Sequence, residues 1–155
     1  MYDTVLVPLD GSRLGECALS HLESIVRSGT TRKILLVRAV EPAAPSTGEY
    51  NFKPEHVAAI NARTKEDAAR YLEGIAEQPG LLHNGTTVAT TVLSGAPGDV
   101  IAPYAEQVHA DLILMSTHGR SGAKRWIFGS LADKILRQSC IPVLMVRGPG
   151  CCVEA

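Results

Sequence analysis

The residues whose types and spacing could best bind a ligand lie in one glycine-bearing segment in the last third of the chain. This segment runs from Met115 to Ser130 and reads MSTHGRSGAKRWIFGS. Gly119 would let the backbone approach a ligand closely, and Gly129 and Ser130 stand where amide N–H groups would open a helix. Those amides, the serine hydroxyl and the positive end of the helix dipole all favour a bound anion. The pattern fits a phosphate cradle, and a glycine-bearing loop followed by an ordinary Ser N-cap fits it equally well.

Other nucleotide-binding and catalytic signatures are missing from the sequence. It holds no G-x-x-x-x-G-K-[ST] loop, and Gly11 and Gly15 do not have G-x-G-x-x-G spacing. No nucleophile constellation surrounds His118, and no paired carboxylates or arginine finger can be assigned. These absences disfavour P-loop kinases, Rossmann dehydrogenases and fast hydrolases. We expect a protein that is not an enzyme, or at most a slow and incidental ATPase.

Length and charge narrow the class of protein further. The chain has 155 residues, of which 45% are hydrophobic and 20% charged, and its formal net charge is −1. This composition is typical of one globular domain with a hydrophobic core, and the charge balance gives no reason to expect a nucleic-acid partner. The N-terminal residues do not resemble a secretory signal, and no apolar run approaches the ~20 residues that cross a bilayer. We expect a cytoplasmic protein with no membrane partner.

The cysteines predict no metal site. None of the four has C-x-x-C spacing. Cys17 and Cys140 fall in apolar patterns and are expected in the core. Cys151 and Cys152 belong to the segment 148–155, which we expect to be a flexible C-terminal tail.

The elements that would position the glycine segment alternate between strands and helices. Short apolar or β-branched runs predict strands at 4–9, 33–40, 86–93, 112–115 and 142–146. Apolar residues at helical spacing predict helices after the Asp10-Gly11-Ser12 turn, over about 54–77, from Pro97, and from Gly129-Ser130 to about Gln138. The residues expected to face the core are Leu14, Cys17, Ala18, His21, Leu22 and Ile25 in the first helix, and Val57, Ile60, Ala68, Tyr71, Leu72 and Ile75 in the second. Loops are predicted at 41–53 and 116–128.

This alternation predicts a single α/β domain built on a doubly wound parallel sheet. Such sheets bind ligands outside the carboxyl ends of their strands, where the winding direction reverses. The site should therefore gather Asp10, the end of the second strand at 38–40 and the loop after Met115.

Four segments together resemble the universal stress protein family. They are VLVPLDGS at 5–12, VLSGAPGDVI at 92–101, the MSTHGRSG…FGS loop, and IPVLMVR at 141–147, in the order in which the family carries them. The family's nucleotide-binding branch has G-x-x-G, nine further residues, and then G-[ST]. In this chain nine residues separate Gly119 from Gly129-Ser130, and Ser116 stands at the first glycine of the pattern. A serine can keep the loop close to a ligand there if its φ is negative.

The resemblance implies a Rossmann-like, five-stranded sheet in the order 3-2-1-4-5, a family domain over 1–147, and bound ATP, ADP or AMP. Mg²⁺ is the usual companion of ATP. The resemblance assigns ten residues to the nucleotide: Pro8 and Asp10 at the ribose end, Ala39, Val40 and Met115 around the adenine, Ser116 in the adjoining loop, and Gly119, Gly129, Ser130 and Leu131 at the phosphates. From the residues alone, Asp10 could instead cap the first helix through an Asx turn. Ala39, Val40 and Met115 also have an ordinary core explanation.

The last strand, 142–146, is expected at a sheet edge, where an uncharged exposed strand invites pairing. In the resembling family this strand pairs with its own copy, which implies a homodimer through Val143, Leu144, Met145 and Val146. The expected function is a dimeric stress-response sensor or regulator that binds an adenine nucleotide and acts on an unidentified protein partner. Two alternatives remain open: a dimeric interaction protein of the family that binds no nucleotide, and an enzyme related to the adenine-nucleotide hydrolase folds. The second lacks the glycine-serine loop that such enzymes carry after their first strand.

Overall fold

The chain folds as strands and helices in strict alternation. The computed structural model describes residues 2–44, 53–82, 85–117 and 130–147. The elements are β1 (Thr4–Pro8), α1 (Arg13–Arg27), β2 (Lys33–Val40), α2 (Pro54–Ala76), β3 (Thr87–Ser94), α3 (Pro97–Gln107), β4 (Leu112–Ser116), α4 (Ser130–Gln138) and β5 (Val143–Val146).

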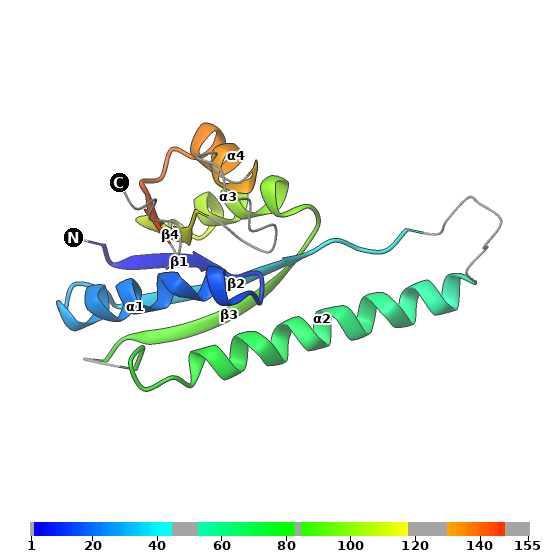
Figure 1. The fold of residues 1–155 in the computed structure, drawn as a ribbon, viewed down its shortest axis with the longest axis horizontal. Coiled ribbons are helices and arrows are strands. Elements are labelled where there is room, and N and C mark those ends of the chain that lie inside the picture. Colours follow the sequence, from blue (N-terminus) through cyan, green and yellow to red (C-terminus); the bar gives the residue numbers. More distant parts are fainter. Residues whose placement is uncertain (1, 45–52, 83–84, 118–129, 148–155) are drawn as a thin grey trace, which may run out of the picture.

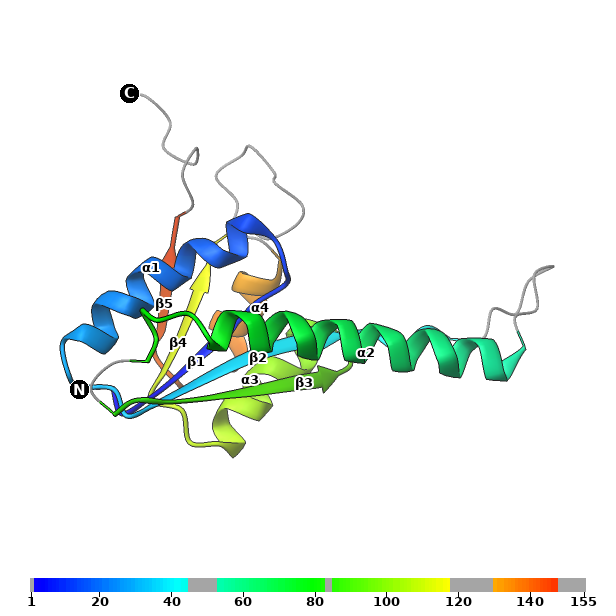
Figure 2. The same cartoon turned by 90° about the horizontal axis from the view of Figure 1, so that it is seen from below.

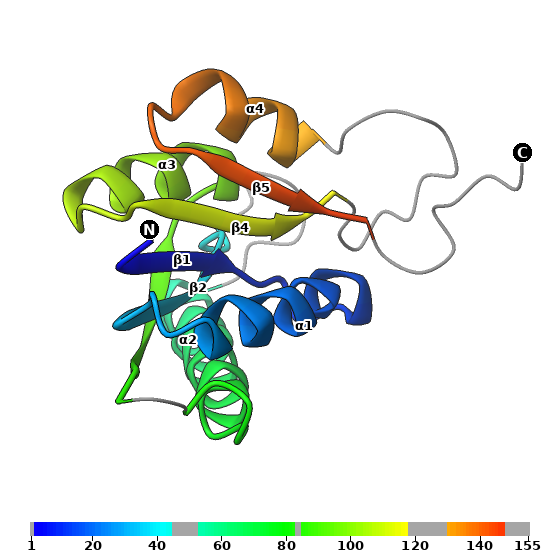
Figure 3. The ribbon, with the colours of Figure 1, turned by 90° about the vertical axis from the view of Figure 1, so that its left-hand side faces the viewer.

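The five strands form one parallel sheet in the order β3-β2-β1-β4-β5, which confirms the predicted doubly wound α/β fold. α1 and α2 cover one face of the sheet, and α3 and α4 cover the other (Figures 1 and 3). β1 lies in the middle, and its Val5, Leu6 and Val7 are completely buried. Strands that are covered on both faces have continuous apolar runs in their sequence, which is why the run at 4–9 predicts β1.

Each face of the sheet has its own hydrophobic core. Side chains of successive residues in a strand point to opposite faces. Val5 and Val7 therefore pack with Leu22 of α1 and Leu72 of α2. The neighbouring Leu6 packs on the other face among residues of α3, β4 and α4.

The hydrogen-bonded ladders part between β1 and β4 at the carboxyl end of the sheet. β1 pairs with β2 as far as Pro8, and β4 pairs with β5 as far as Ser116. β1 and β4 pair with each other only as far as Leu6 and Ile113. β2 and β3 lie on one side of this pair and β5 on the other. The ladders thus open at the switch in winding direction, where doubly wound sheets bind ligands.

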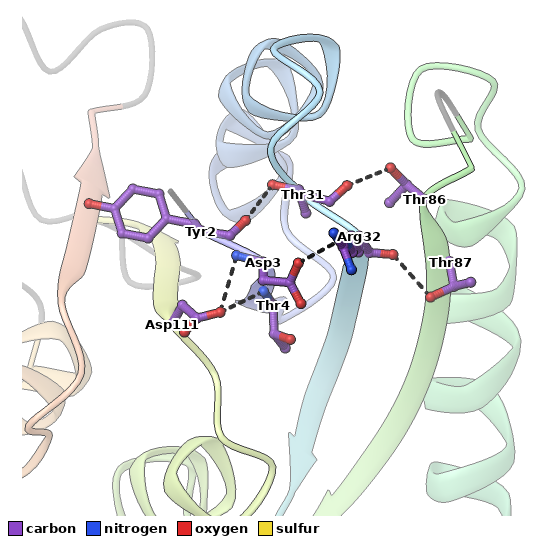
Figure 4. Close-up of polar contacts among 8 residues, drawn as sticks. All are labelled: Tyr2, Asp3, Thr4, Thr31, Arg32, Thr86, Thr87 and Asp111. Atoms are coloured by element: carbon purple, nitrogen blue, oxygen red, sulfur yellow. Dashed lines mark hydrogen bonds and ion pairs between the residues drawn. The ribbon is translucent and has the colours of Figure 1, made fainter.

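Polar contacts tie the strands together at the opposite, amino end (Figure 4). The Asp111 carboxylate accepts hydrogen bonds from the backbone N–H groups of Asp3 and Thr4, at 3.1 and 2.8 Å. The hydroxyl of Thr86 donates to the carbonyl of Thr31 at 2.9 Å. These contacts join the start of β1 to that of β4, and the start of β2 to that of β3. They fix the register of the strands at the end of the sheet opposite the candidate site.

The first helix buries a different stripe from the one predicted. His21 is exposed, whereas Cys17 and Ile25 are only half-buried. Leu19 and Val26 lie on the adjacent flank and offer more apolar surface to the sheet than Cys17 and His21 do. The buried positions of α1 are Gly15, Ala18, Leu19, Leu22 and Val26.

Two other expectations about burial are wrong. Ile60 is 48% exposed because the first half of α2 extends beyond the sheet (Figures 1 and 2). Cys140 is exposed because it lies in the connection between α4 and β5 rather than in either element.

The residues that follow β2 lie alongside the overhanging part of α2 and are bonded to it. The Asn61 side chain accepts a hydrogen bond from the Ala43 N–H at 2.7 Å and donates one to the Ala43 carbonyl at 3.2 Å. One amide side chain therefore satisfies both backbone groups of a residue in an extended, exposed segment. This overhang, residues 41–44 together with the first half of α2, is called the arm below.

Candidate functional site

The β1–α1 turn places Asp10 at the open end of the sheet. Asp10 Oδ1 accepts hydrogen bonds from the Ser12 N–H at 2.9 Å and from the Ser12 hydroxyl at 2.6 Å. Ser12 caps α1 in turn, because its Oγ accepts the Gly15 N–H at 3.0 Å. The Asx turn is therefore present, and it engages one of the two carboxylate oxygens.

Gly15 makes room for the Asp10 carboxylate. A Cβ atom on Gly15 would lie 2.6 Å from Asp10 Oδ1 and 3.3 Å from Ser12 Oγ. Glycine inside a helix costs roughly 1 kcal/mol relative to alanine. Glycine is present at this position of α1 although it lowers helix stability, because a side chain there would collide with the Asp10 carboxylate. The sequence contained a signal for this, a glycine in the first turn of a helix, but motif spacing alone did not connect it with Asp10.

An apolar wall forms on the face covered by α3 and α4. Met115 belongs to the core cluster there, and Ala39 and Leu131 pack against the same cluster. Met115 is 4% exposed. Val40 is also buried, but it follows Ala39 in β2, so its side chain points to the opposite face of the sheet and is not part of this wall. Predicted adenine contacts from two strands thus meet one residue of α4 on the same side of the sheet.

The amino end of α4 is held in place by α3. Lys134 forms an ion pair with Asp99, with 2.5 Å between Nζ and Oδ1. Its aliphatic stem packs over Gly98, where a Cβ atom would lie 2.5 Å from Lys134 Cδ. Ser130, the first residue of α4, is exposed. A helix terminus anchored in this way presents its dipole in a defined direction.

Ser116 ends β4 and does not begin a loop. It is buried, at 9% exposure, and belongs to the strand. Among the non-glycine residues that the structure describes, only His109 has a positive φ. The serine therefore occupies the first glycine position of the motif without backbone strain. Gly119 and Gly129 lie outside the described residues.

A polar cluster beside the turn was not predicted. Arg38, near the end of β2, holds its guanidinium carbon 5.1 Å from the centre of the Tyr71 ring. Arg38 Nη1 also lies 3.1 Å from the position that a Cβ atom on Gly11 would take. The Tyr71 hydroxyl donates to Glu16 Oε1 at 2.9 Å. Burial, together with this bond to a carboxylate, raises the pKa of Tyr71 above its ordinary value, so the phenol stays a neutral donor.

Two features of the sequence could have pointed to this cluster. Arg38 interrupts the otherwise apolar second half of KILLVRAV, and a cation in a buried strand needs a partner. Tyr71 was expected on the core side of α2, but its hydroxyl was given no acceptor. Sequence spacing could not show that Arg38 reaches the β1–α1 turn and that Tyr71 reaches the first turn of α1.

The described part of the chain offers neither a metal cluster nor a membrane span. Within it, no group of three or more His, Cys, Asp or Glu side chains could hold a metal ion. None of its helices combines the length and apolar character of a membrane span. The expected tail, 148–155 with Cys151 and Cys152, lies outside the described residues.

Comparison with known proteins supports the resemblance seen in the sequence. The model of the universal stress protein family matches residues 1–147. The universal stress protein MJ0531 of Methanocaldococcus jannaschii is 28% identical over 152 residues, covering 96% of this chain and 84% of the relative. YxiE of Bacillus subtilis is 28% identical over 151 residues, covering 95% of this chain and all of the relative.

Solved structures share the fold. MJ0577 of M. jannaschii superposes with a TM-score of 0.81 at 26% identity, covering 96% of this chain and 97% of that one. A universal stress protein in complex with cAMP gives 0.58 at 24% identity, covering 94% and 97%. The AMP-bound Arabidopsis thaliana protein At3g01520 gives 0.61 at 18% identity, covering 96% and 93%, and these last two likenesses show the fold alone. The family model spans every strand and helix from β1 to β5, and this chain therefore belongs to the universal stress protein family.

Proposed function

We propose that this protein binds an adenine nucleotide, ATP first, at the carboxyl end of its sheet and acts as a stress-response regulator. The observation that carries the proposal is the open β1–β4 ladder, with Asp10 on one side and the Met115 wall and the start of α4 on the other. The AMP and cAMP bound by two proteins of the same fold support the choice of an adenine nucleotide.

Each part of the site has a task in this proposal. The Asp10 carboxylate accepts hydrogen bonds from ribose hydroxyls, and the apolar wall packs on the base. The amino end of α4 and the glycine segment before it hold the phosphates through amide N–H groups. Mg²⁺ enters with ATP, on its phosphate oxygens. The residues proposed to line the nucleotide are Pro8, Asp10, Ala39, Val40, Met115, Ser116, Gly119, Gly129, Ser130 and Leu131.

The same site favours binding over turnover. The carboxylates nearest the turn have structural bonds: Asp10 holds Ser12, and Glu16 holds the Tyr71 hydroxyl. Hydrolysis needs a residue that positions water and a cation that stabilises the transition state. We therefore propose little or no hydrolysis, with a protein partner in the cytoplasm receiving the signal.

Calorimetric titration with Mg-ATP tests the nucleotide site. We expect saturable binding by the wild type and its loss in Gly129→Arg, because the new side chain fills the phosphate position. Gly74→Arg is the matched control, since Gly74 lies exposed in α2 and a Cβ atom there meets nothing within 4 Å. A folded, dimeric wild type that binds no adenine nucleotide would contradict the proposal and favour the interaction-protein alternative.

We also propose that β5 pairs with its own copy in a homodimer. β5 ends the strand order, so among the residues that the structure describes only one of its edges is bonded. Its sequence, VLMV, carries no charge that would discourage pairing, and Leu144 is 42% exposed. A second copy related by a two-fold axis covers both the open edge and this side chain.

A further inference from the structure

We propose that Arg38 and Tyr71 act as positioning residues that hold the β1–α1 turn in the shape that presents Asp10 to a ribose. This inference rests on the proposed nucleotide function and assigns neither residue a contact with the ligand. It concerns the ribose end of the site, away from the glycine segment.

The two residues reach the turn at both of its ends. Arg38 packs against Gly11, which directly follows Asp10 and has a φ of +81°. Tyr71 bonds to Glu16, which lies in the first turn of α1. The stacked pair therefore connects the entry and the exit of the turn through α2.

The chemistry of the contact favours arginine at this position. A planar guanidinium stacks on an aromatic face and is less strongly hydrated than an ammonium group. Gly11 is restricted twice, because its φ disfavours other residues and a Cβ atom would come within 3.1–3.3 Å of three guanidinium atoms of Arg38. The turn and the guanidinium are thus packed to fit one another.

The proposal separates a positioning role from a general structural one. Asp10 addresses the ribose, so a disordered turn should weaken recognition of the ribose hydroxyls and leave the phosphate end unaffected. Losses from Arg38→Met should then be the same for AMP, ADP and ATP. They should also shrink the preference for a ribonucleotide over its 2′-deoxy form.

The experiment compares Arg38→Met and Tyr71→Phe with Arg70→Met, a control at an exposed arginine one position from Tyr71. Dissociation constants are measured for AMP, ATP and their 2′-deoxy forms. We expect Arg38→Met to reduce the ribose preference by about tenfold, the effect of a lost charge-assisted hydrogen bond, and Tyr71→Phe to reduce it less. Arg70→Met should match the wild type.

A second readout needs no nucleotide. The Ser12 and Gly15 amides are bonded within the turn, and their hydrogen-exchange rates in the ligand-free protein report its order. We expect both rates to rise in Arg38→Met and to stay constant in the control. Unchanged rates, or an unchanged ribose preference in a protein that binds ATP, overturn the inference. If the wild type binds no nucleotide, the proposed function fails, and the exchange rates alone decide whether Arg38 holds the turn.

Discussion

Asp10 shows how one side chain can support both a fold and a site. Its Oδ1 accepts two hydrogen bonds from Ser12, which fix the shape of the β1–α1 turn. The same bonds hold the carboxylate at the end of β1. The carboxylate occupies space that only a glycine at position 15 leaves open. The position of this carboxylate therefore depends on a glycine five residues further along the chain.

Gly15→Ala and Gly74→Ala should have different effects on stability and affinity, although both residues lie in helices. At Gly74 nothing approaches a new Cβ atom, so alanine should stabilise the protein by about 0.5–1 kcal/mol through its helix propensity. At Gly15 the new methyl group displaces the Asp10 carboxylate, so the same gain should be absent and ATP affinity should fall about tenfold. Urea unfolding and titration of both variants check this. Equal stabilisation with unchanged affinity would show that Asp10 does not need the space.

The half-buried phenol of Tyr71 should make stability depend on pH in the alkaline range. In the unfolded chain a tyrosine ionises near pH 10, whereas burial and Glu16 raise the pKa of Tyr71 in the folded protein. Above about pH 10 the unfolded chain releases a proton that the folded chain keeps, so stability falls as pH rises. The melting temperature of the wild type should therefore drop more steeply from about pH 10 to about pH 11.5 than that of Tyr71→Phe. Parallel slopes would mean that the phenol is as free in the folded chain as in the unfolded one.

The apolar runs could place Asp10 just after one strand and Met115 at the end of another, and the family resemblance made both of them candidates. Residue types and spacing could not supply the Arg38 cluster, because stacking and the bond from Tyr71 to Glu16 join residues of three different elements. The phosphate end rests on spacing alone, since Gly119 and Gly129 lie outside the described residues. Its assignment remains a prediction.

Among the elements, α2 shows what helical periodicity predicts and what it leaves open. Its bounds, Pro54–Ala76, agree with the sequence pattern to within a residue. The burial of Ile60 was nevertheless predicted wrongly, because helical periodicity reports which residues share a face but not how far the sheet beneath them extends. The stripe on α1 was displaced for a related reason, since two adjoining flanks are both partly apolar.

Asn61 should control the order of the arm and little else. Asn61→Ala removes both hydrogen bonds to Ala43, so we expect faster hydrogen exchange at the Ala43 amide and in the first turns of α2. The overall melting temperature should hardly change, since few buried side chains are affected. Thr64→Ala, which removes only a bond within the same helix, is the control and should leave Ala43 protected. A large loss of global stability in Asn61→Ala would show that the arm belongs to the cooperative core.

For the whole molecule, the sheet order was the most reliable prediction. The family resemblance implied the order 3-2-1-4-5, and the structure has it. Right-handed crossovers restrict the possible topologies of a parallel sheet, but they do not select this order by themselves. What no single chain can display is a second copy at the β5 edge. The homodimer stays a prediction for that reason.

Met145→Pro should produce monomers. The carbonyls of Pro142 and Val146 bond to β4, and because backbone groups alternate in direction along a strand, those of Val143 and Met145 face outward. Proline at 145 removes an outward N–H without removing a bond to β4. Met145→Ile keeps that N–H and should remain dimeric. Analytical ultracentrifugation measures the oligomeric state of both variants. If folded Met145→Pro still sediments as a dimer, the interface lies elsewhere.

The contact between Asp111 and the start of β1 also sets a delay during synthesis on the ribosome. It joins backbone and carboxylate groups 108 residues apart. At translation rates of 5–20 residues per second, that distance takes roughly 5 to 20 seconds to synthesise. During this interval β1 can pair with β2, but its other edge, an apolar run, still waits for β4. Such an edge is open to aggregation and to chaperones, so the nascent chain needs protection at a strand that the finished protein buries completely.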